Sequence, residues 1–586
     1  MMDIMTSKYY TNERGVQIIL SLLKAHGVRK IIASPGTTNL SLVASMQQDP
    51  FFEMYSSVDE RSAAYMACGM AAESGEPVAI TCTGATASRN YMPGLTEAFY
   101  RKLPVVALTA NQGVHNIGHL IAQNIDRRQT PNDIVKISVD VPVVKDERDA
   151  WLCNVNVNKA LLELTHHGGG PVHINFSTTY SRDYSVKKLP QERVIERVDS
   201  TDRLPHIDVQ GHIGIFVGSH PKFTEEETHA IEKFCEVHNA VVFCDHTSGY
   251  YGKYRVQYAL VGAQSAANST RTLDLLIHIG EVSGDYYGMN ISPKEVWRVS
   301  EDGEVKDFFK KLRYVFEMSA KTFFSLYGQG NPRPTTYWDE CCANYQRVYD
   351  KIPELPFSNI WIAQQLSNKI PSHSVLHLGI LNTLRSWNLF NVPETVETCC
   401  NVGGFGIDGI MSTLLGASLA SPNKLFFGIL GDLAFFYDLN SIANRHVGSN
   451  LRIMLINNGR GTEFTNYDHP GHAFGKDADP YIAAAGHFGH QSHTLVRHYA
   501  EDLGFKYLTA SNKEEFVKMY AEFISSEQLS FPILFEVFTD SQDESNAIEI
   551  IKTLEKIPKT AKQVIKKVVV DVLGENTYIK IRKKIK

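Results

Sequence analysis

Short apolar runs alternate with helical stretches along almost the whole chain, and this alternation constrains the fold more than any other feature of the sequence. Apolar runs of this length indicate buried strands of a parallel sheet, and the stretches between them indicate the connecting helices. A chain of 586 residues is too long for a single core, because domains average about 100–200 residues. The pattern predicts an α/β protein made of consecutive doubly wound parallel-sheet domains.

Interruptions of this alternation indicate the domain boundaries. A polar, charged stretch over residues 187–203 has the composition of a linker, and proline-rich segments lie near residues 330–334 and 353–356. We predict three domains, over residues 1–188, 189–350 and 351–545, followed by a tail over residues 546–586. The expected strands are residues 29–33, 54–58, 78–83 and 105–109 in the first domain, 212–217, 241–244 and 273–280 in the second, and 375–378, 425–430, 452–456 and 533–537 in the third.

Composition excludes several classes of protein. A net charge of −6 gives no reason to expect a nucleic-acid partner. Nine cysteines occur without a C-x-x-C spacing, so reduced thiols are a simpler interpretation than a zinc site or a disulfide framework. Residues 1–11 lack the apolar segment of a signal peptide, and no apolar run reaches the roughly 18 residues that span a bilayer. We expect a cytoplasmic protein.

Two neighbouring strands of the third domain deliver polar side chains to one edge. The strand expected over residues 425–430 ends on Gly431-Asp432, and the strand over residues 452–456 is followed by Asn458. Open α/β sheets bind ligands at the carboxyl ends of their strands. Carboxylate and amide oxygens suit Mg²⁺, which takes further ligands from a diphosphate. A helix cap and a turn would explain either residue alone, but the pair predicts a magnesium–diphosphate site.

A second acidic residue, Glu60, begins a predicted helix of small residues. One interpretation is an ordinary carboxylate cap at a helix start, which is common. The other is a carboxylate that hydrogen-bonds a ring nitrogen of a ligand at a crowded interface. Close helix packing is expected because small residues recur, namely Ala63, Ala64, Ala67, Gly69 and Ala71.

These two segments together resemble the motifs of thiamine-diphosphate enzymes. The segment from Asp432 to Asn458 resembles their magnesium–diphosphate motif, and Asp59-Glu60-Arg61 resembles the motif whose glutamate contacts the aminopyrimidine ring. The resemblance covers about residues 17–539. It implies thiamine diphosphate and Mg²⁺ as cofactors, with a pyrimidine-binding first domain, a central domain and a diphosphate-binding third domain. It also implies a homodimer or homotetramer, in which the cofactor lies between the first domain of one subunit and the third domain of its partner.

Within this superfamily the sequence most resembles the menaquinone-pathway family that makes 2-succinyl-5-enolpyruvyl-6-hydroxy-3-cyclohexene-1-carboxylate (SEPHCHC). The stretches that carry the resemblance are Ser34-Pro35-Gly36, Asp59-Glu60-Arg61, Gly406-Ile407-Asp408-Gly409 with Ser412-Thr413, and Gly431-Asp432-Leu433 with Tyr437-Asp438-Leu439-Asn440. It implies that the cofactor-binding residues are Glu60, Ile407, Gly431, Asp432, Leu433, Ala434, Asn458 and Phe464. The implied metal ligands are Asp432, Asn458 and the backbone carbonyl of Arg460.

The resemblance implies a carboligase. A 2-oxo acid donor loses carbon dioxide, and its acyl anion passes to a carbonyl or related acceptor. The implied catalytic residues are Glu60, which acts on the pyrimidine ring, and Arg385, which holds the donor carboxylate. The alternatives are a SEPHCHC synthase, a simple 2-oxo acid decarboxylase, and an inactive scaffold paralogue. The intact Glu60, Asp432 and Asn458 argue against the last of these.

The sequence departs from that family at two arginine positions. Thr38 and Val402 stand where arginines are expected, which removes charge-assisted hydrogen bonds of about 1.5–3 kcal/mol each. We therefore predict a small monocarboxylic donor such as pyruvate, a neutral or sugar-like carbonyl acceptor, and little SEPHCHC synthase activity. An arginine from elsewhere, such as Arg89, Arg101 or Arg127, would restore the missing charge.

The carboxyl-terminal tail has a different composition. Residues 551–586 carry eleven Lys and Arg against three acidic residues, with apolar residues at near-helical spacing. One interpretation is a solvated, partly ordered helix. The other is a weak peripheral contact with an anionic membrane surface or a protein partner, which basic amphipathic helices make.

Overall fold

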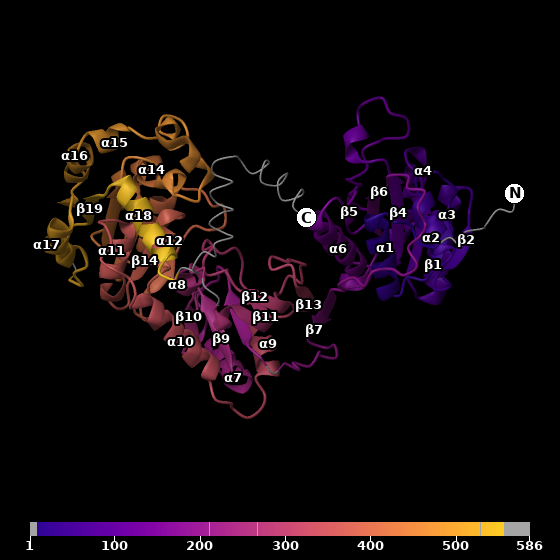
Figure 1. Ribbon diagram of the computed structural model, residues 1–586, viewed down its shortest axis with the longest axis horizontal. Coiled ribbons are helices and arrows are strands. Elements are labelled where there is room, and N and C mark those ends of the chain that lie inside the picture. Colours follow the sequence, from indigo (N-terminus) through magenta and orange to yellow (C-terminus); the bar gives the residue numbers. More distant parts are fainter. Residues whose placement is uncertain (1–8, 210, 266–267, 528, 556–586) are drawn as a thin grey trace, which may run out of the picture. The chain divides into compact units, whose positions relative to one another are not determined.

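The computed structural model describes residues 9–209, 211–265, 268–527 and 529–555 (Figure 1). It divides into two compact units. The first unit comprises the chain up to Pro205 together with Val296–Met318, and the second comprises His206–Glu295 and the chain from Ser319 onward. Three parallel sheets organise these units, which confirms the predicted α/β class.

The first sheet, in the first unit, has six parallel strands in the order β2-β1-β3-β4-β6-β5. Its strands are β1 (Lys30–Ala33), β2 (Glu53–Ser56), β3 (Val78–Cys82), β4 (Val105–Asn111), β5 (Ser138–Val141) and β6 (Val172–Ser177), and its helices are α1 (Arg14–Ala25), α2 (Leu40–Met46), α3 (Glu60–Ser74), α4 (Thr86–Asn90), α5 (Met92–Tyr100) and α6 (Glu147–Leu162). Successive strand residues face opposite sides, so Ile31 packs with α1, α2 and α6 and Ile32 packs with α3 and α5. Both faces are covered, as the predicted doubly wound arrangement requires.

The middle sheet is also parallel. In the second unit its strands lie in the order β10-β9-β8-β11, and β13 pairs with β7 in the first unit. The elements are β7 (Glu196–Asp199), β8 (Ile213–Val217), β9 (Ala240–Cys244), β10 (Arg255–Gln257), β11 (Thr272–Ile279), β12 (Ser292–Val299) and β13 (Leu312–Glu317), with α7 (Glu225–His238), α8 (Ala259–Gly262), α9 (Ala320–Tyr327) and α10 (Thr336–Tyr349). The prediction that residues 187–203 form a linker is wrong for residues 196–199, which form strand β7. Only Val198 of this strand is buried, so its apolar pattern is too weak to identify a strand.

The third sheet lies in the second unit and has the order β15-β14-β16-β17-β19-β18. Its strands are β14 (Val375–Leu378), β15 (Glu397–Cys399), β16 (Phe426–Gly431), β17 (Leu451–Asn457), β18 (Lys506–Ala510) and β19 (Ile533–Phe538), and its helices are α11 (Asn359–Leu366), α12 (Asn382–Trp387), α13 (Ile410–Ala420), α14 (Asp432–Tyr437), α15 (Phe488–Gln491), α16 (Leu495–Asp502), α17 (Lys513–Phe523) and α18 (Ser541–Lys552). When the strands of each sheet are numbered from one in chain order, the first and third sheets have the same strand order, 2-1-3-4-6-5. The two domains therefore repeat one topology, although the sequence shows no internal repeat.

The start of the predicted tail is helical, because α18 continues to Lys552. The rest of the tail, residues 556–586, lies outside the described residues, so its two interpretations stay open. Within the described part of the chain, no helix combines the length and the apolar character needed to cross a bilayer.

Candidate active site

The site in the second unit is built at the carboxyl edge of β16 and β17. These strands pair in parallel with Gly431 opposite Ile456, so Asp432 and Asn458 follow the strands at one edge, as predicted. The backbone N–H of Gly459 donates to Asp432 Oδ2 at 2.7 Å. Gly459 has φ +80° and a Cβ there would strike the His490 ring, so the turn after Asn458 requires glycine.

A cavity of about 340 Å³ opens at this edge. The predicted residues of the third domain line it together: Ile407, Gly431, Asp432, Leu433, Ala434, Asn458, Arg460 and Phe464. Sequence reasoning missed other lining residues, among them Asn359, Leu381, Phe405, Glu463 and Glu544. Leu381 and Phe405 have φ of 70° and 55°, which non-glycine residues adopt only where the surroundings enforce it.

The oxygen atoms at the edge fit a divalent cation. Asp432 is 2% exposed, and its carboxylate accepts hydrogen bonds from the Leu433 N–H at 2.8 Å and His487 Nε2 at 3.0 Å. Asn458 Oδ1 is buried and has no hydrogen-bond partner among the described residues. A buried acceptor without a partner is costly, and Mg²⁺ coordination would satisfy it. The Arg460 side chain pairs with Asp479 at 2.6 Å, which leaves its backbone to serve the site.

Arg385 lies next to this cavity, in a small one of about 40 Å³ that Asn382 and Glu544 also line. Its Nη1 lies 2.6 and 2.5 Å from the two carboxylate oxygens of Glu463. The guanidinium also lies over the Tyr286 ring, 4.8 Å from its centroid. The predicted carboxylate-binding cation is thus already paired with an acid of the chain.

Glu544 is a buried carboxyl group that lines both cavities. Its two oxygens accept from the Asn359 N–H at 3.0 Å, and one also accepts from the Thr539 hydroxyl at 2.8 Å. Burial raises the pKa of Glu544 to about 7. It connects the start of α18 to the start of α11.

Glu60 lies in the first unit, as the first residue of α3. The preceding Asp59 is the cap, because its side chain accepts the Arg61 N–H at 3.1 Å. Glu60 therefore has no capping role. Its side chain is half-buried, and the Asn90 amide donates a hydrogen bond to its carboxylate at 3.5 Å. The alanines at 63, 64, 67 and 71 are buried, and a Cβ on Gly94 of α5 would strike Ala64. These small residues allow α3 and α5 to pack closely against each other within this unit.

Thr38 is buried at the edge of the first sheet. Its hydroxyl contacts that of Thr83 and lies 3.5 Å from the carbonyl of Ala110. The guanidinium of Arg127, which is 4% exposed, donates to the same Ala110 carbonyl and to Asn175 Oδ1 at 2.9 Å. No carboxylate lies within ion-pair distance of Arg127 in the described part of the chain.

Arg89 and Arg101, the other arginines considered for the missing charge, do not lie beside Thr38, and among the described residues no cation replaces the arginine expected at Val402. Arg89 donates to the Asp126 carbonyl at 3.1 Å, and Arg101 pairs with Glu97 at 3.3 Å. Val402 is buried, and it does not line the cavity at Asp432. Of the three arginines considered for the missing charge, Arg127 alone joins the hydrogen-bond network of Thr38.

Parallel sheets with a polar carboxyl edge are typical of α/β enzymes that bind a ligand at that edge. Residues 13–130 match the family described as thiamine pyrophosphate enzyme, N-terminal TPP binding domain. The chain is 32% identical over 567 residues to the 2-succinyl-5-enolpyruvyl-6-hydroxy-3-cyclohexene-1-carboxylate synthase of Bacteroides thetaiotaomicron, covering 92% of this chain and 98% of the relative. Identity is 32% to the synthase of Bacteroides fragilis, again over 92% and 98%, and 27% to that of Christiangramia forsetii, over 89% and 95%. The chain belongs to this family of thiamine-diphosphate-dependent enzymes.

Proposed function

We propose that the protein is a magnesium-dependent carboligase, which decarboxylates a 2-oxo acid and transfers the acyl anion to an acceptor. The observation that carries this proposal is the cavity at Asp432, which the predicted residues of the third domain line together. It includes Asn458, whose buried Oδ1 has no hydrogen-bond partner in the described part of the chain. Asp432, Asn458 and the Arg460 carbonyl would hold Mg²⁺, and Ile407 would support the cofactor. Thiamine diphosphate, when bound, supplies the electron sink for loss of carbon dioxide. Glu60 would hydrogen-bond the pyrimidine ring and hold its proton.

The first specific candidate is the reaction in the relatives' name, SEPHCHC synthesis. The 32% identity to the Bacteroides thetaiotaomicron synthase, over 92% of this chain, supports it. The buried guanidinium of Arg127, which shares the Ala110 carbonyl with Thr38, also supports it. A cation without a carboxylate partner attracts an anionic substrate group more strongly in a buried setting than in water. This observation favours the synthase more than the residue types at positions 38 and 402 suggest.

The second candidate is a carboligase with a small monocarboxylic donor, and the pair of Arg385 with Glu463 favours it. Nη1 of Arg385 already contacts both oxygens of the Glu463 carboxylate, and this ion pair reduces the attraction of the guanidinium for a second carboxylate. A second substrate carboxylate would also lie near the charge of Glu463, and like charges repel. The pair therefore supports a donor without an additional carboxylate.

Product analysis separates these candidates. The protein, thiamine diphosphate and Mg²⁺ would be incubated with isochorismate and either 2-oxoglutarate or pyruvate, and the products identified by mass spectrometry. The succinylated product from 2-oxoglutarate would establish the synthase and contradict the small-donor candidate. A product that contains the pyruvate-derived acyl unit, without the succinylated product, would establish the small-donor carboligase and contradict the synthase. An aldehyde alone, with any acceptor offered, would indicate a simple decarboxylase.

Replacing Glu463 is expected to change donor preference. Glu463→Gln keeps the size of the side chain and frees the Arg385 charge, so the kcat/KM ratio of 2-oxoglutarate over pyruvate should rise about 10-fold, the effect of roughly 1.4 kcal/mol. Steady-state kinetics with both donors would measure the ratio. Glu501→Gln, which breaks the exposed pair with Arg497, is the matched control. An unchanged ratio in Glu463→Gln would contradict a role of this pair in donor selection.

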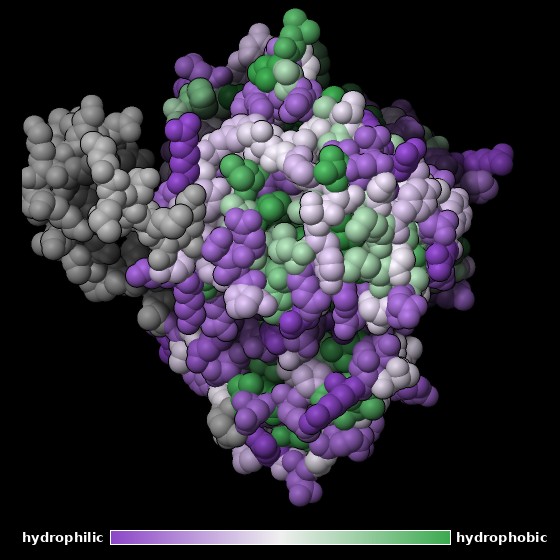
Figure 2. Space-filling view, turned by 90° about the vertical axis from the view of Figure 1, so that its right-hand side faces the viewer, coloured by the Kyte–Doolittle hydropathy of each residue, from purple (hydrophilic) through white to green (hydrophobic). Residues whose placement is uncertain are grey.

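We also propose at least a homodimer. Exposed apolar side chains gather on and around α3. Tyr55 and Met66 are each 41% exposed, and Val58 is 81% exposed. Figure 2 views the side of the first unit on which α3 lies, and apolar side chains appear there among pale and hydrophilic ones. Large apolar side chains that gather on one exposed face are typical of a protein interface.

Light scattering tests the dimer. The wild-type protein should have at least twice the mass of one chain, and Tyr65→Glu with Met66→Glu should lower both mass and activity, because charges oppose burial of this face. Leu326→Glu, at an apolar side chain with 41% exposure on α9, is the control. A monomeric wild-type protein with full activity would contradict a site shared between subunits.

A further inference from the structure

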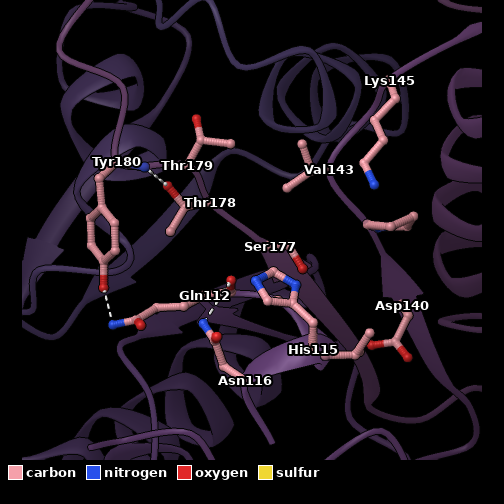
Figure 3. A pocket seen from close by; sticks show the side chains of 13 residues that line it. Gln112, His115, Asn116, Asp140, Val143, Lys145, Ser177, Thr178, Thr179 and Tyr180 are labelled. Atoms are coloured by element: carbon pink, nitrogen blue, oxygen red, sulfur yellow. Dashed lines mark hydrogen bonds between the residues drawn. The ribbon is translucent and has the colours of Figure 1, made fainter. Parts of the chain in front are cut away.

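A second cavity, of about 550 Å³, lies in the first unit at the carboxyl ends of β4, β5 and β6 (Figure 3). We call it the edge pocket. Its walls are residues 112–116 after β4, residues from 140 to 145 at and after the end of β5, and residues 177–180 at the end of β6. None of these residues belongs to the site at Asp432. The volume is that of a pocket for a small organic ligand.

Several hydrogen-bonding groups stand among the apolar residues of the walls. The Gln112 amide donates to the Tyr180 hydroxyl oxygen at 2.6 Å, which leaves the Tyr180 hydroxyl proton free to donate. Ser177 donates to Asn111 Oδ1 at 3.0 Å, and Thr179 donates to the buried Glu13 carboxylate at 3.1 Å. Both hydroxyls thereby keep lone pairs that accept hydrogen bonds. Such a lining suits a ligand with several hydroxyl groups.

The charges of the edge pocket are not paired with one another. Among the described residues, the Lys145 ammonium and the His115 ring have no hydrogen-bond or ion-pair partner. Asp140 accepts the Asn175 amide at 2.6 Å through one carboxylate oxygen, and it forms no ion pair with Lys145. Figure 3 shows Lys145, His115 and Asp140 around the same hollow. A free cation beside acceptors for hydroxyl groups suits a hydroxylated ligand that carries one anionic group.

The position of the edge pocket connects it with the reaction. Glu60 and Thr38 follow β2 and β1, so they lie at the same carboxyl edge of the same sheet, where doubly wound folds bind ligands. We propose that the edge pocket binds the acceptor substrate, a small hydroxylated carbonyl compound with a single phosphate or carboxylate group. The identification of this ligand as the acceptor rests on the proposed carboligase function, whereas the binding itself does not.

Calorimetry without cofactor or donor tests the binding. The probes are ribose 5-phosphate, ribonate, ribose and inorganic phosphate, titrated into the full-length protein. We expect the phosphate or the carboxylate derivative of the sugar to bind at least tenfold more tightly than ribose or phosphate alone, and which of the two binds identifies the anionic group. Lys145→Met should weaken that binding at least tenfold. Lys188→Met is the matched control, because Lys188 lines a cavity of similar volume, about 510 Å³, in the same unit.

Two results would overturn the proposal: no binding of either sugar anion, or equal weakening by Lys145→Met and Lys188→Met. Thermal unfolding of each variant would show that it is folded, and Lys145→Arg, which keeps the charge, should retain most of the affinity. Carbon dioxide release from 2-oxo acids is measured separately. Release without sugar-anion binding would reject the edge pocket alone, and binding without release from any donor would reject its assignment to an acceptor.

Discussion

Glu60→Gln is expected to lower the rate of carbon dioxide release by about 10²–10⁴-fold, the usual contribution of a positioned proton-transfer group. Asp59 already caps α3, so the substitution removes a carboxylate that the fold does not need for capping. The amide keeps the size and polarity of the side chain but is no longer a carboxylate. Stopped-flow or steady-state measurement of carbon dioxide release, at saturating cofactor and Mg²⁺, gives the comparison.

The control for this variant lies on the same helix. Glu73 is exposed near the end of α3, so Glu73→Gln removes a carboxylate from the same element without touching the site. It should behave as wild type in activity and in thermal unfolding. Near-wild-type carbon dioxide release by Glu60→Gln would contradict the role assigned to this residue.

Asp432→Ala is expected to weaken magnesium-dependent cofactor binding by more than about 100-fold, because even the partners of metal ligands cost about 10–100-fold when removed. The carboxylate accepts hydrogen bonds from Gly459 and His487 as well, so its loss also loosens the turn after Asn458. Isothermal titration of thiamine diphosphate, with and without Mg²⁺, measures the effect.

Asp432→Asn separates charge from structure, since it keeps an oxygen of the same shape but removes the anion. It too should bind the cofactor poorly in Mg²⁺. Asp477→Ala, at an exposed position of the same domain, should bind like wild type. Cofactor affinity that is equal in wild type and both Asp432 variants would argue against a metal site at this edge.

Local sequence pattern was sufficient for the strands that position the site. The predicted third-domain strand over residues 375–378 coincides with β14, and those before Asp432 and Asn458 differ from β16 and β17 by a residue at either end. Apolar runs that are buried on both faces identify such strands without help from neighbours. Strand β7 was missed because an edge strand with one buried residue lacks that pattern.

The partners of the site residues were not predictable in the same way. Glu463 neutralises Arg385 across a separation of 78 residues, and Arg127 joins Thr38 through a backbone carbonyl of β4. Both contacts depend on tertiary packing rather than on spacing along the chain. The sequence therefore indicated which residues line the cavity at Asp432. The ion pair of Arg385 and the contacts of Arg127 became visible only in the structure.

Release of labelled carbon dioxide from carboxyl-labelled 2-oxo acids would measure the proposed decarboxylation itself. The protein would be depleted of metal and cofactor, then assayed with thiamine diphosphate, with Mg²⁺, and with both, against a panel that includes 2-oxoglutarate and pyruvate. We expect release from at least one donor only when both cofactors are present, and we expect this release to be lost in Asp432→Ala and Glu60→Gln. Release that is independent of both cofactors, or no release from any donor by folded protein that binds them, would show that the protein is not a thiamine-diphosphate- and magnesium-dependent carboligase.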